Sequence, residues 1–153
     1  MRNFFRSFTF AAKGLWFCLR HERNFRIHMA AGFYVLLLAP YFPLSRGEWA
    51  VLVTVIGLML AAEALNTAVE QAVNLASPHR RTRARVAKDV AAGAVLLCAG
   101  AAIAVAAFLF WRPAAWAGML ADFRIHRWKP LALLLSLGPM LWFVFGGGRR
   151  KKG

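Results

Sequence analysis

The sequence predicts an all-α membrane protein with an N-terminal interfacial amphipathic helix, three transmembrane helices and a short fourth C-terminal span. Of the 153 residues, 60% are hydrophobic and only 17% are charged, which is too apolar for a soluble domain of this size. The net charge of +14 is compatible with binding to nucleic acid, anionic lipid headgroups or a polyphosphate. The long apolar runs favour the last two over nucleic acid.

The first element, over about residues 4–26, has the pattern of a helix lying in the headgroup plane of a bilayer. Apolar side chains recur at steps of four and three, and basic side chains lie seven residues apart on the opposite face. The apolar set is Phe4, Phe8, Ala11, Leu15 and Cys18, and the basic set is Arg6, Lys13 and Arg20. An interfacial helix turns such cations toward lipid phosphates. The alternative for this segment alone is a soluble helix packed on a protein core.

Hydrophobic runs that are long enough to cross a bilayer follow this helix. The expected spans cover about residues 27–44, 49–75 and 90–111. The third has 22 uncharged residues, enough for a hydrocarbon core ~30 Å thick. A shorter run over 131–147 contains Gly138 and Pro139, so it either spans with a kink or only dips into the membrane. We therefore expect one domain over 1–111 and a C-terminal extension over 112–153 that ends in a basic tail.

The basic residues are divided unevenly between the two sides of these spans. Fifteen of the 20 Lys and Arg residues lie before the first span, between the second and third, or after the fourth, and five lie on the other side. Positively charged segments stay in the cytoplasm during membrane insertion. The N-terminus and the loop at 77–88 are therefore expected there, together with the C-terminus if the fourth run crosses the membrane.

A polar stripe interrupts the second span near its cytoplasmic end. Its members are Glu63, Asn66, Thr67, Glu70 and Asn74. Helical geometry places all of them on one face, and the rise of about 16 Å takes the stripe from the acyl region to the headgroups. Hydrogen bonds between the helices of an oligomer are one explanation. Ionisable groups at membrane depth are costly, however, and indicate a functional site.

The acidic residues on this side of the membrane suggest phosphoryl chemistry. Carboxylates in a low dielectric need a cation, a metal or a proton. The deeper Glu63 suits a general base, and Glu70, nearer water, suits Mg²⁺ held together with substrate phosphates. Glu22 could complete this Mg²⁺ site, while Lys88 could neutralise phosphate oxygens. Taken singly, Glu22 could also form a surface ion pair, and Asp89 could simply be favoured by the dipole of its helix.

Three segments resemble a known family of enzymes. "FAAKGLWFCLRHERNFRIH", "EALNTAVEQAVN" and "RVAKDVAAGAVLL" are similar to the bacterial diacylglycerol kinase and undecaprenol kinase family, small homotrimeric membrane proteins unrelated to soluble kinases. The likeness covers about residues 4–111. It implies an ATP-dependent lipid kinase of the bacterial cytoplasmic (inner) membrane with its active site on the cytoplasmic face. Such an enzyme transfers the ATP γ-phosphoryl group to the primary hydroxyl of undecaprenol or diacylglycerol, giving undecaprenyl phosphate or phosphatidic acid.

The resemblance also implies roles for individual residues. The general base is Glu63, and the catalytic asparagine of the same motif is Asn66. Two glutamates, Glu22 and Glu70, bind Mg²⁺ and so help to bind ATP. The Lys-Asp pair that contacts the nucleotide is Lys88 and Asp89. The sequence contains no Walker A motif, Gly-x-Gly-x-x-Gly loop or protein-kinase signature. Any nucleotide site is therefore of another kind.

Two features depart from the family pattern. An aspartate common one turn after the second glutamate is Asn74 here, which weakens any role for this position in binding metal. The loop before the Lys-Asp pair is strongly basic, which either alters nucleotide contacts or strengthens binding to anionic phospholipids. The sequence favours undecaprenol over diacylglycerol only slightly. The competing interpretation is a non-catalytic oligomeric membrane protein that binds anionic lipid.

Overall fold

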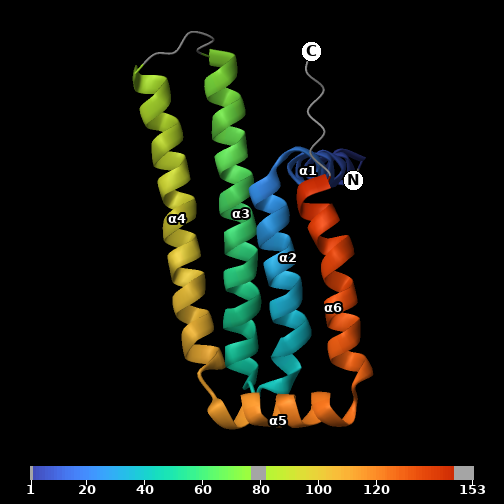
Figure 1. Cartoon of the computed structure of the whole chain (residues 1–153). Coiled ribbons are helices and arrows are strands. Elements are labelled where there is room, and N and C mark those ends of the chain that lie inside the picture. The colour runs from blue at the N-terminus through green and yellow to red at the C-terminus, as the bar shows by residue number, and fades with distance from the viewer. Residues whose placement is uncertain (1, 77–81, 147–153) are drawn as a thin grey trace.

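The computed structural model describes residues 2–76 and 82–146, and every regular element in these two ranges is helical. Figure 1 shows α2, α3, α4 and α6 standing side by side, with α1 lying across one end and α5 across the other. The elements are α1 Arg2–His21, α2 Arg23–Leu38, η1 Ala39–Tyr41, α3 Arg46–Ala76, α4 Thr82–Phe110, α5 Pro113–Ile125, α6 Trp128–Leu141 and η2 Trp142–Gly146. The loop residues Arg80 and Arg81 and the basic tail after Gly148 lie outside the described residues.

Three stretches of the described chain are long and apolar enough to cross a membrane, which confirms the expected fold class. They are α3, α4, and α6 continued by η2. The C-terminal run, expected to be short, forms a helical stretch of 19 residues. The first apolar run instead forms the 16-residue α2, which follows the extended residue Glu22 and ends just before Pro40. Proline lacks a backbone N–H, so the α-helical hydrogen-bond ladder does not continue past this point.

The upright helices pack through small residues and one buried apolar cluster. α3 and α4 lie antiparallel to each other, and α2 packs on another side of α3 (Figure 1). At Gly32 of α2, an added Cβ would lie only 3.0 Å from the Ile56 Cγ2 of α3, so glycine permits this close approach. Ala39, Leu52 and Leu109 form a buried cluster that joins η1, α3 and α4. The position of α2 against α3 is thereby fixed.

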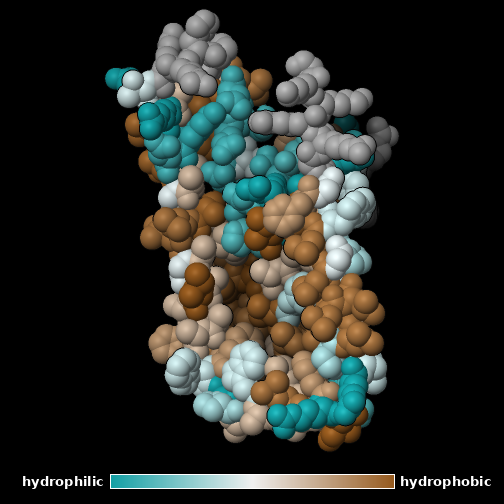
Figure 2. Space-filling view, viewed as in Figure 1, coloured by the Kyte–Doolittle hydropathy of each residue, from teal (hydrophilic) through white to brown (hydrophobic). Residues whose placement is uncertain are grey.

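Much of the apolar surface of α4 has no partner within the described chain. Leu97 and Ile103 are 78% and 71% exposed, and Phe108 is 84% exposed. Figure 2 shows hydrophilic residues toward both ends of the molecule and a hydrophobic band between them. This distribution is the one that a lipid bilayer requires of a spanning bundle.

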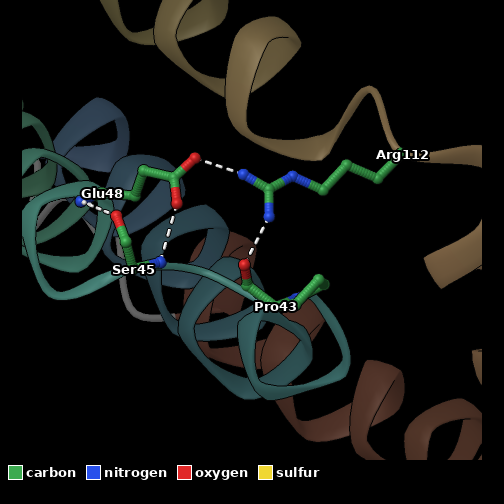
Figure 3. Close-up of polar contacts among 4 residues, drawn as sticks. All are labelled: Pro43, Ser45, Glu48 and Arg112. Carbon is green, nitrogen blue, oxygen red and sulfur yellow. Dashed lines mark hydrogen bonds and ion pairs between the residues drawn. The ribbon is translucent and has the colours of Figure 1, made fainter.

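A polar clamp at the α5 end holds the start of the C-terminal extension. The backbone N–H of Ser45 donates to Glu48 Oε2 at 2.7 Å, and that of Glu48 donates to Ser45 Oγ at 3.3 Å. This is the reciprocal capping box that starts a helix, here α3. Arg112, just beyond α4, donates to Glu48 Oε1 and to the carbonyl of Pro43 (Figure 3). The α2–α3 connection is therefore fastened to the α4–α5 connection.

Helix α5 was not expected from the sequence. It begins with Pro113, a residue favoured at the first helical position. Asp122 on this helix accepts hydrogen bonds from Lys129 Nζ at 2.7 Å and from the Tyr41 hydroxyl at 3.1 Å. The other carboxylate oxygen, Oδ1, lies 2.9 Å from His126 Nδ1. These contacts hold α5 against η1 and the beginning of α6.

Candidate active site

The polar stripe of α3 runs from the interior of the molecule to its surface, toward the end of the bundle where α1 lies. Glu63 and Thr67 are only 3% and 5% exposed, Asn66 and Glu70 are partly buried, and Asn74 is exposed. Thr67 Oγ1 donates to the carbonyl oxygen of Glu63 at 3.1 Å. Asn66 Nδ2 donates to Glu70 Oε1 at 3.3 Å. The stripe is thus one connected polar face whose deepest carboxylate belongs to Glu63.

Glu63 meets a histidine from the neighbouring helix α2. His28 Nε2 lies 3.2 Å from Glu63 Oε1, close enough for an ion pair when the imidazole is protonated. Within the described residues, however, neither Glu63 Oε1 nor Asn66 Oδ1 has a partner with hydrogen-bond geometry, although both atoms are buried. A buried acceptor left without a donor is costly, so two of them in one stripe suggest that a ligand supplies the donors. Sequence reasoning missed His28, whose only signal is its place in the segment "HERNFRIH".

The two residues of the Lys-Asp pair on α4 lie in different environments, one in contact with the polar stripe and the other exposed. Lys88 Nζ donates to Asn74 Oδ1 at 2.7 Å, which brings this ammonium group to the outer end of the stripe. The Asp89 side chain is 69% exposed, and its carboxylate lies 3.7 Å from Arg85 on the same helix. Of the pair, Lys88 therefore contacts the stripe directly, while Asp89 lies at the open surface next to it.

Glu22 occupies the corner between α1 and α2. It is the single extended residue between the two helices, with φ −101° and ψ 113°, and its side chain makes no capping hydrogen bond. Glu70 lies two helical turns after Glu63 on the same face of α3. Cys18 lies on the last turn of α1, and burial raises the pKa of its thiol. The thiol therefore stays neutral at neutral pH, and the charge of the site comes from the glutamates.

The glutamates fit a metal that is shared with a nucleotide. Within residues 2–76 and 82–146, no group of three or more His, Cys, Asp and Glu side chains is placed to bind a metal by itself. Mg²⁺ usually keeps several waters and binds one or two carboxylates plus substrate phosphates. Glu70, on the same helix as Glu63, and Glu22, at the corner between α1 and α2, carry the hard oxygen atoms that Mg²⁺ prefers. The donor set therefore fits Mg²⁺ that arrives with a polyphosphate.

An apolar recess lies next to the polar stripe. It has a volume of about 600 Å³ and is bounded by α1, α2 and α3. Trp16, Met29 and Leu60 contribute to its wall. Leu60 lies one helical turn before Glu63, on the same side of α3. Glu63 is not among the residues that line the recess, so an alkyl chain bound there would contact this apolar wall and not the stripe itself.

Comparison with known proteins identifies the family. Residues 9–110 match the family described as prokaryotic diacylglycerol kinase. The chain belongs to the prokaryotic diacylglycerol kinase family. Over 99 residues the chain is 42% identical to the undecaprenol kinase of Bacillus subtilis. The aligned region covers 65% of this chain and 80% of that protein. Over 112 residues the chain is 39% identical to the diacylglycerol kinase of a Synechocystis species. This aligned region covers 72% of this chain and 64% of that protein.

Membership of the prokaryotic diacylglycerol kinase family confirms the assignment made from the three sequence segments. It makes this chain an ATP-dependent membrane lipid kinase. The matched region of the prokaryotic diacylglycerol kinase family contains all the candidate site residues and ends at 110. The C-terminal extension, with α5, α6 and η2, lies beyond it.

Proposed function

We propose that this kinase phosphorylates undecaprenol, with diacylglycerol as the alternative acceptor, at the cytoplasmic face of the bacterial inner membrane. The observation that carries the proposal is the buried Glu63 carboxylate, whose Oε1 has no partner with hydrogen-bond geometry among the described residues and lies 3.2 Å from His28 Nε2. The choice of undecaprenol is supported by the higher identity to the undecaprenol kinase and the larger share of that relative that is matched.

Glu63 acts as the general base in this mechanism. As its carboxylate takes the proton of the lipid hydroxyl, the hydroxyl oxygen attacks the γ-phosphorus of ATP. A new O–P bond forms, the bond between the γ-phosphorus and the β–γ bridging oxygen breaks, and ADP leaves. Burial keeps bulk water away from Glu63, and this favours transfer to the lipid over hydrolysis. Asn66, whose Oδ1 also lacks a donor, is placed to orient the hydroxyl.

The remaining charged residues surround the nucleotide phosphates. Glu22 and Glu70 would hold Mg²⁺ together with these phosphates, and the bound metal would offset the negative charge on the transferred group. Lys88, which binds Asn74 in the free chain, has a flexible stem that can turn to a phosphate oxygen. Asp89 is exposed at the same edge and remains available to the nucleotide.

The proposed packing between subunits and the proposed contacts with phospholipids involve surfaces outside the candidate active site. The exposed apolar face of α4, which includes Leu97 and Ile103, is available for packing between subunits of a homotrimer. Gly93 and Gly100 of α4 have open space around them, so another helix could approach closely. Lys13 and Arg20 of α1 are placed to contact anionic phospholipids from the headgroup plane.

The first test is phosphate transfer from labelled ATP to undecaprenol and to diacylglycerol, offered separately in mixed micelles with Mg²⁺. Glu63→Gln should lower kcat by ~10² or more with either lipid while nucleotide binding is retained, because only the proton acceptor is lost. Glu48→Gln is the matched control, since it removes a carboxylate from the other end of the same helix, and it should keep its turnover per folded molecule. Faster transfer to diacylglycerol would overturn the choice of acceptor. Equal activity of Glu63→Gln and the native protein would overturn the role of Glu63.

A further inference from the structure

The joint between α1 and α2 consists of one residue. α1 ends at His21, α2 begins at Arg23, and Glu22 between them is extended. The N–H of Glu22 donates to the Cys18 carbonyl at 2.8 Å, and its own carbonyl accepts from the N–H of Arg26 at 3.3 Å. Only a few backbone torsions at this joint set the angle between the helices. Contacts that bridge the joint must therefore hold the angle and, with it, the position of the Glu22 carboxylate.

Arg26 of α2 provides such a bridge. Its side chain is buried, with 2% of the residue exposed, and Nη1 donates to the carbonyl oxygens of Leu19 and Arg20, each at 3.2 Å. These carbonyls lie in the last turn of α1, where the helix has no N–H to offer them and its dipole is negative. Among the described residues, no carboxylate lies within ion-pair distance of Arg26. Its charge is therefore balanced by carbonyl oxygens, and leaving any of them would be costly.

The third acceptor of Arg26 belongs to the C-terminal extension. Arg26 Nε donates to the carbonyl oxygen of Val144 at 3.1 Å, across 118 residues of sequence. Val144 is itself buried, and η2, which contains it, packs against α2. Figure 1 shows this end of α6 next to α1 and to the beginning of α2. Nε and Nη1 belong to one planar guanidinium group. The hydrogen bonds to α1 and the hydrogen bond to η2 are therefore made by the same rigid group.

We propose that Arg26 is a positioning residue through which the C-terminal helix sets the place of Glu22, so that α6 and η2 support catalysis. The proposal rests on the proposed function, because the role of Glu22 toward Mg²⁺ is part of it. If the hydrogen bond to Val144 is lost, the guanidinium group is no longer held in one orientation by η2. The hydrogen bonds from Arg26 to α1 then restrain the helix less, and α1 can rotate about Glu22. The Glu22 carboxylate then shifts relative to Glu70, and Mg²⁺ bound with the nucleotide is held less well.

The structural half of the proposal is tested by hydrogen exchange on the full chain in lipid nanodiscs. Arg26→Lys keeps the charge, but a lysine ammonium cannot donate to all three carbonyls from one plane. Amides of Trp142–Gly146 and of the last turn of α1 should exchange about tenfold faster in this variant. Arg23→Lys, at an exposed position of the same helix, is the control and should leave both segments unchanged. Faster exchange in α1 with unchanged exchange in Trp142–Gly146 would overturn the link to the extension.

A second pair of variants tests the same link from the other side, without touching Arg26. Val144→Ala removes side-chain contacts that seat η2, and coupling between two sites is reciprocal. The last turn of α1 should therefore exchange about threefold faster in Val144→Ala and remain unchanged in Phe145→Ala, which alters an exposed neighbour. If amides in the last turn of α1 exchange equally slowly in the two variants, the C-terminal extension does not stabilise the joint between α1 and α2.

The catalytic half is tested by the dependence of lipid phosphorylation on Mg²⁺. In Arg26→Lys the half-saturating Mg²⁺ concentration should rise about fivefold, with kcat largely regained at saturating Mg²⁺. A lower kcat with an unchanged Mg²⁺ requirement would indicate a purely structural role and overturn the positioning. Binding of Mn²⁺ with a non-hydrolysable ATP analogue, followed by electron paramagnetic resonance, gives a readout independent of turnover and should weaken to the same degree. If the native protein transfers no phosphate, the proposed function fails, while hydrogen exchange and Mn²⁺ binding still decide this inference.

Discussion

At the α5 end of the molecule, the carboxylates of Glu48 and Asp122 accept hydrogen bonds from arginine, serine, tyrosine and lysine donors. At the α1 end, Glu63 and Asn66 each keep a buried side-chain oxygen that has no partner with hydrogen-bond geometry among the described residues, although His28 Nε2 lies 3.2 Å from the Glu63 oxygen. Glu48 and Glu63 belong to the same helix, so the contrast does not come from different helices or from a difference in residue type. It comes from what surrounds each carboxylate.

The difference agrees with the proposed function, in which the groups at the α5 end stabilise the fold and those at the α1 end bind a ligand. An unsatisfied buried acceptor costs roughly 1–3 kcal/mol, so a chain that retains two of them gives up stability at that end. The clamps of Arg112 and Asp122 compensate at the opposite end by tying together the connections between helices. Changes at the two ends should therefore affect different measurements.

After Glu63 itself, the largest effect is expected for His28, its neighbour on α2. His28→Phe keeps an aromatic ring but removes the polar group 3.2 Å from the Glu63 carboxylate, so kcat should fall about tenfold, equivalent to about 1.4 kcal/mol. Thermal stability should change little, because His28 is only partly buried. Steady-state kinetics with the preferred lipid measure the effect, and His21→Phe, at an exposed position of α1, is the control. Unchanged kcat would show that Glu63 works without this neighbour.

A smaller effect of the opposite kind is expected at the α5 end. Arg112→Gln breaks the bonds to Glu48 and Pro43 and should lower the free energy of unfolding by about 1 kcal/mol, the usual scale for a partly exposed ion pair. Turnover per folded molecule should stay the same. Unfolding in mixed micelles followed by circular dichroism measures stability, with Arg124→Gln, on the exposed side of α5, as control. A lower kcat at native stability would contradict the division between the two ends.

The smallest effect concerns acid. The hydrogen bond from Lys129, with those from Tyr41 and His126, holds the pKa of Asp122 below its ordinary value. The folded state therefore favours the ionised carboxylate, so this stabilisation is complete above the ordinary pKa of about 3.9 and is lost as the pH falls through the lower folded value. Exchange of α5 amides, corrected for intrinsic rates, should accelerate only in that acidic range. Asp122→Asn should remove the acid dependence, and its persistence in this variant would assign it to another group.

The sequence was sufficient for features that lie on one helix. The face shared by Glu63, Asn66 and Glu70 follows from helical periodicity, and its gradient of burial follows from its depth in the second span. The family assignment came from contiguous motifs in the same way. These properties depend on spacing along the chain, and spacing is what a single sequence records.

Features that join distant segments could not be predicted. The contact of His28 with Glu63 depends on how closely α2 approaches α3, which Gly32 permits. The bond from Arg26 to Val144 requires the whole extension to fold back along α2. Helix α5 escaped prediction because it is short and has no long apolar run. Its place is set by Asp122, through contacts with η1 and with the beginning of α6.

The direction of α6 returns the chain to the end of the bundle where α1 lies. Each of α3, α4 and α6 runs opposite to the upright helix before it, so η2, which continues α6, lies at the α1 end of the bundle and packs against α2 (Figure 1). Helix α4 ends at Phe110, at the end of the bundle where α5 lies and opposite to the end that η2 reaches (Figure 1). η2 therefore lies at the same end of the bundle as the outer part of the polar stripe and Lys88. A spectroscopic label attached in η2 would therefore report on the end of the bundle that carries Glu70 and Lys88, whereas a label in α5 would report on the opposite end.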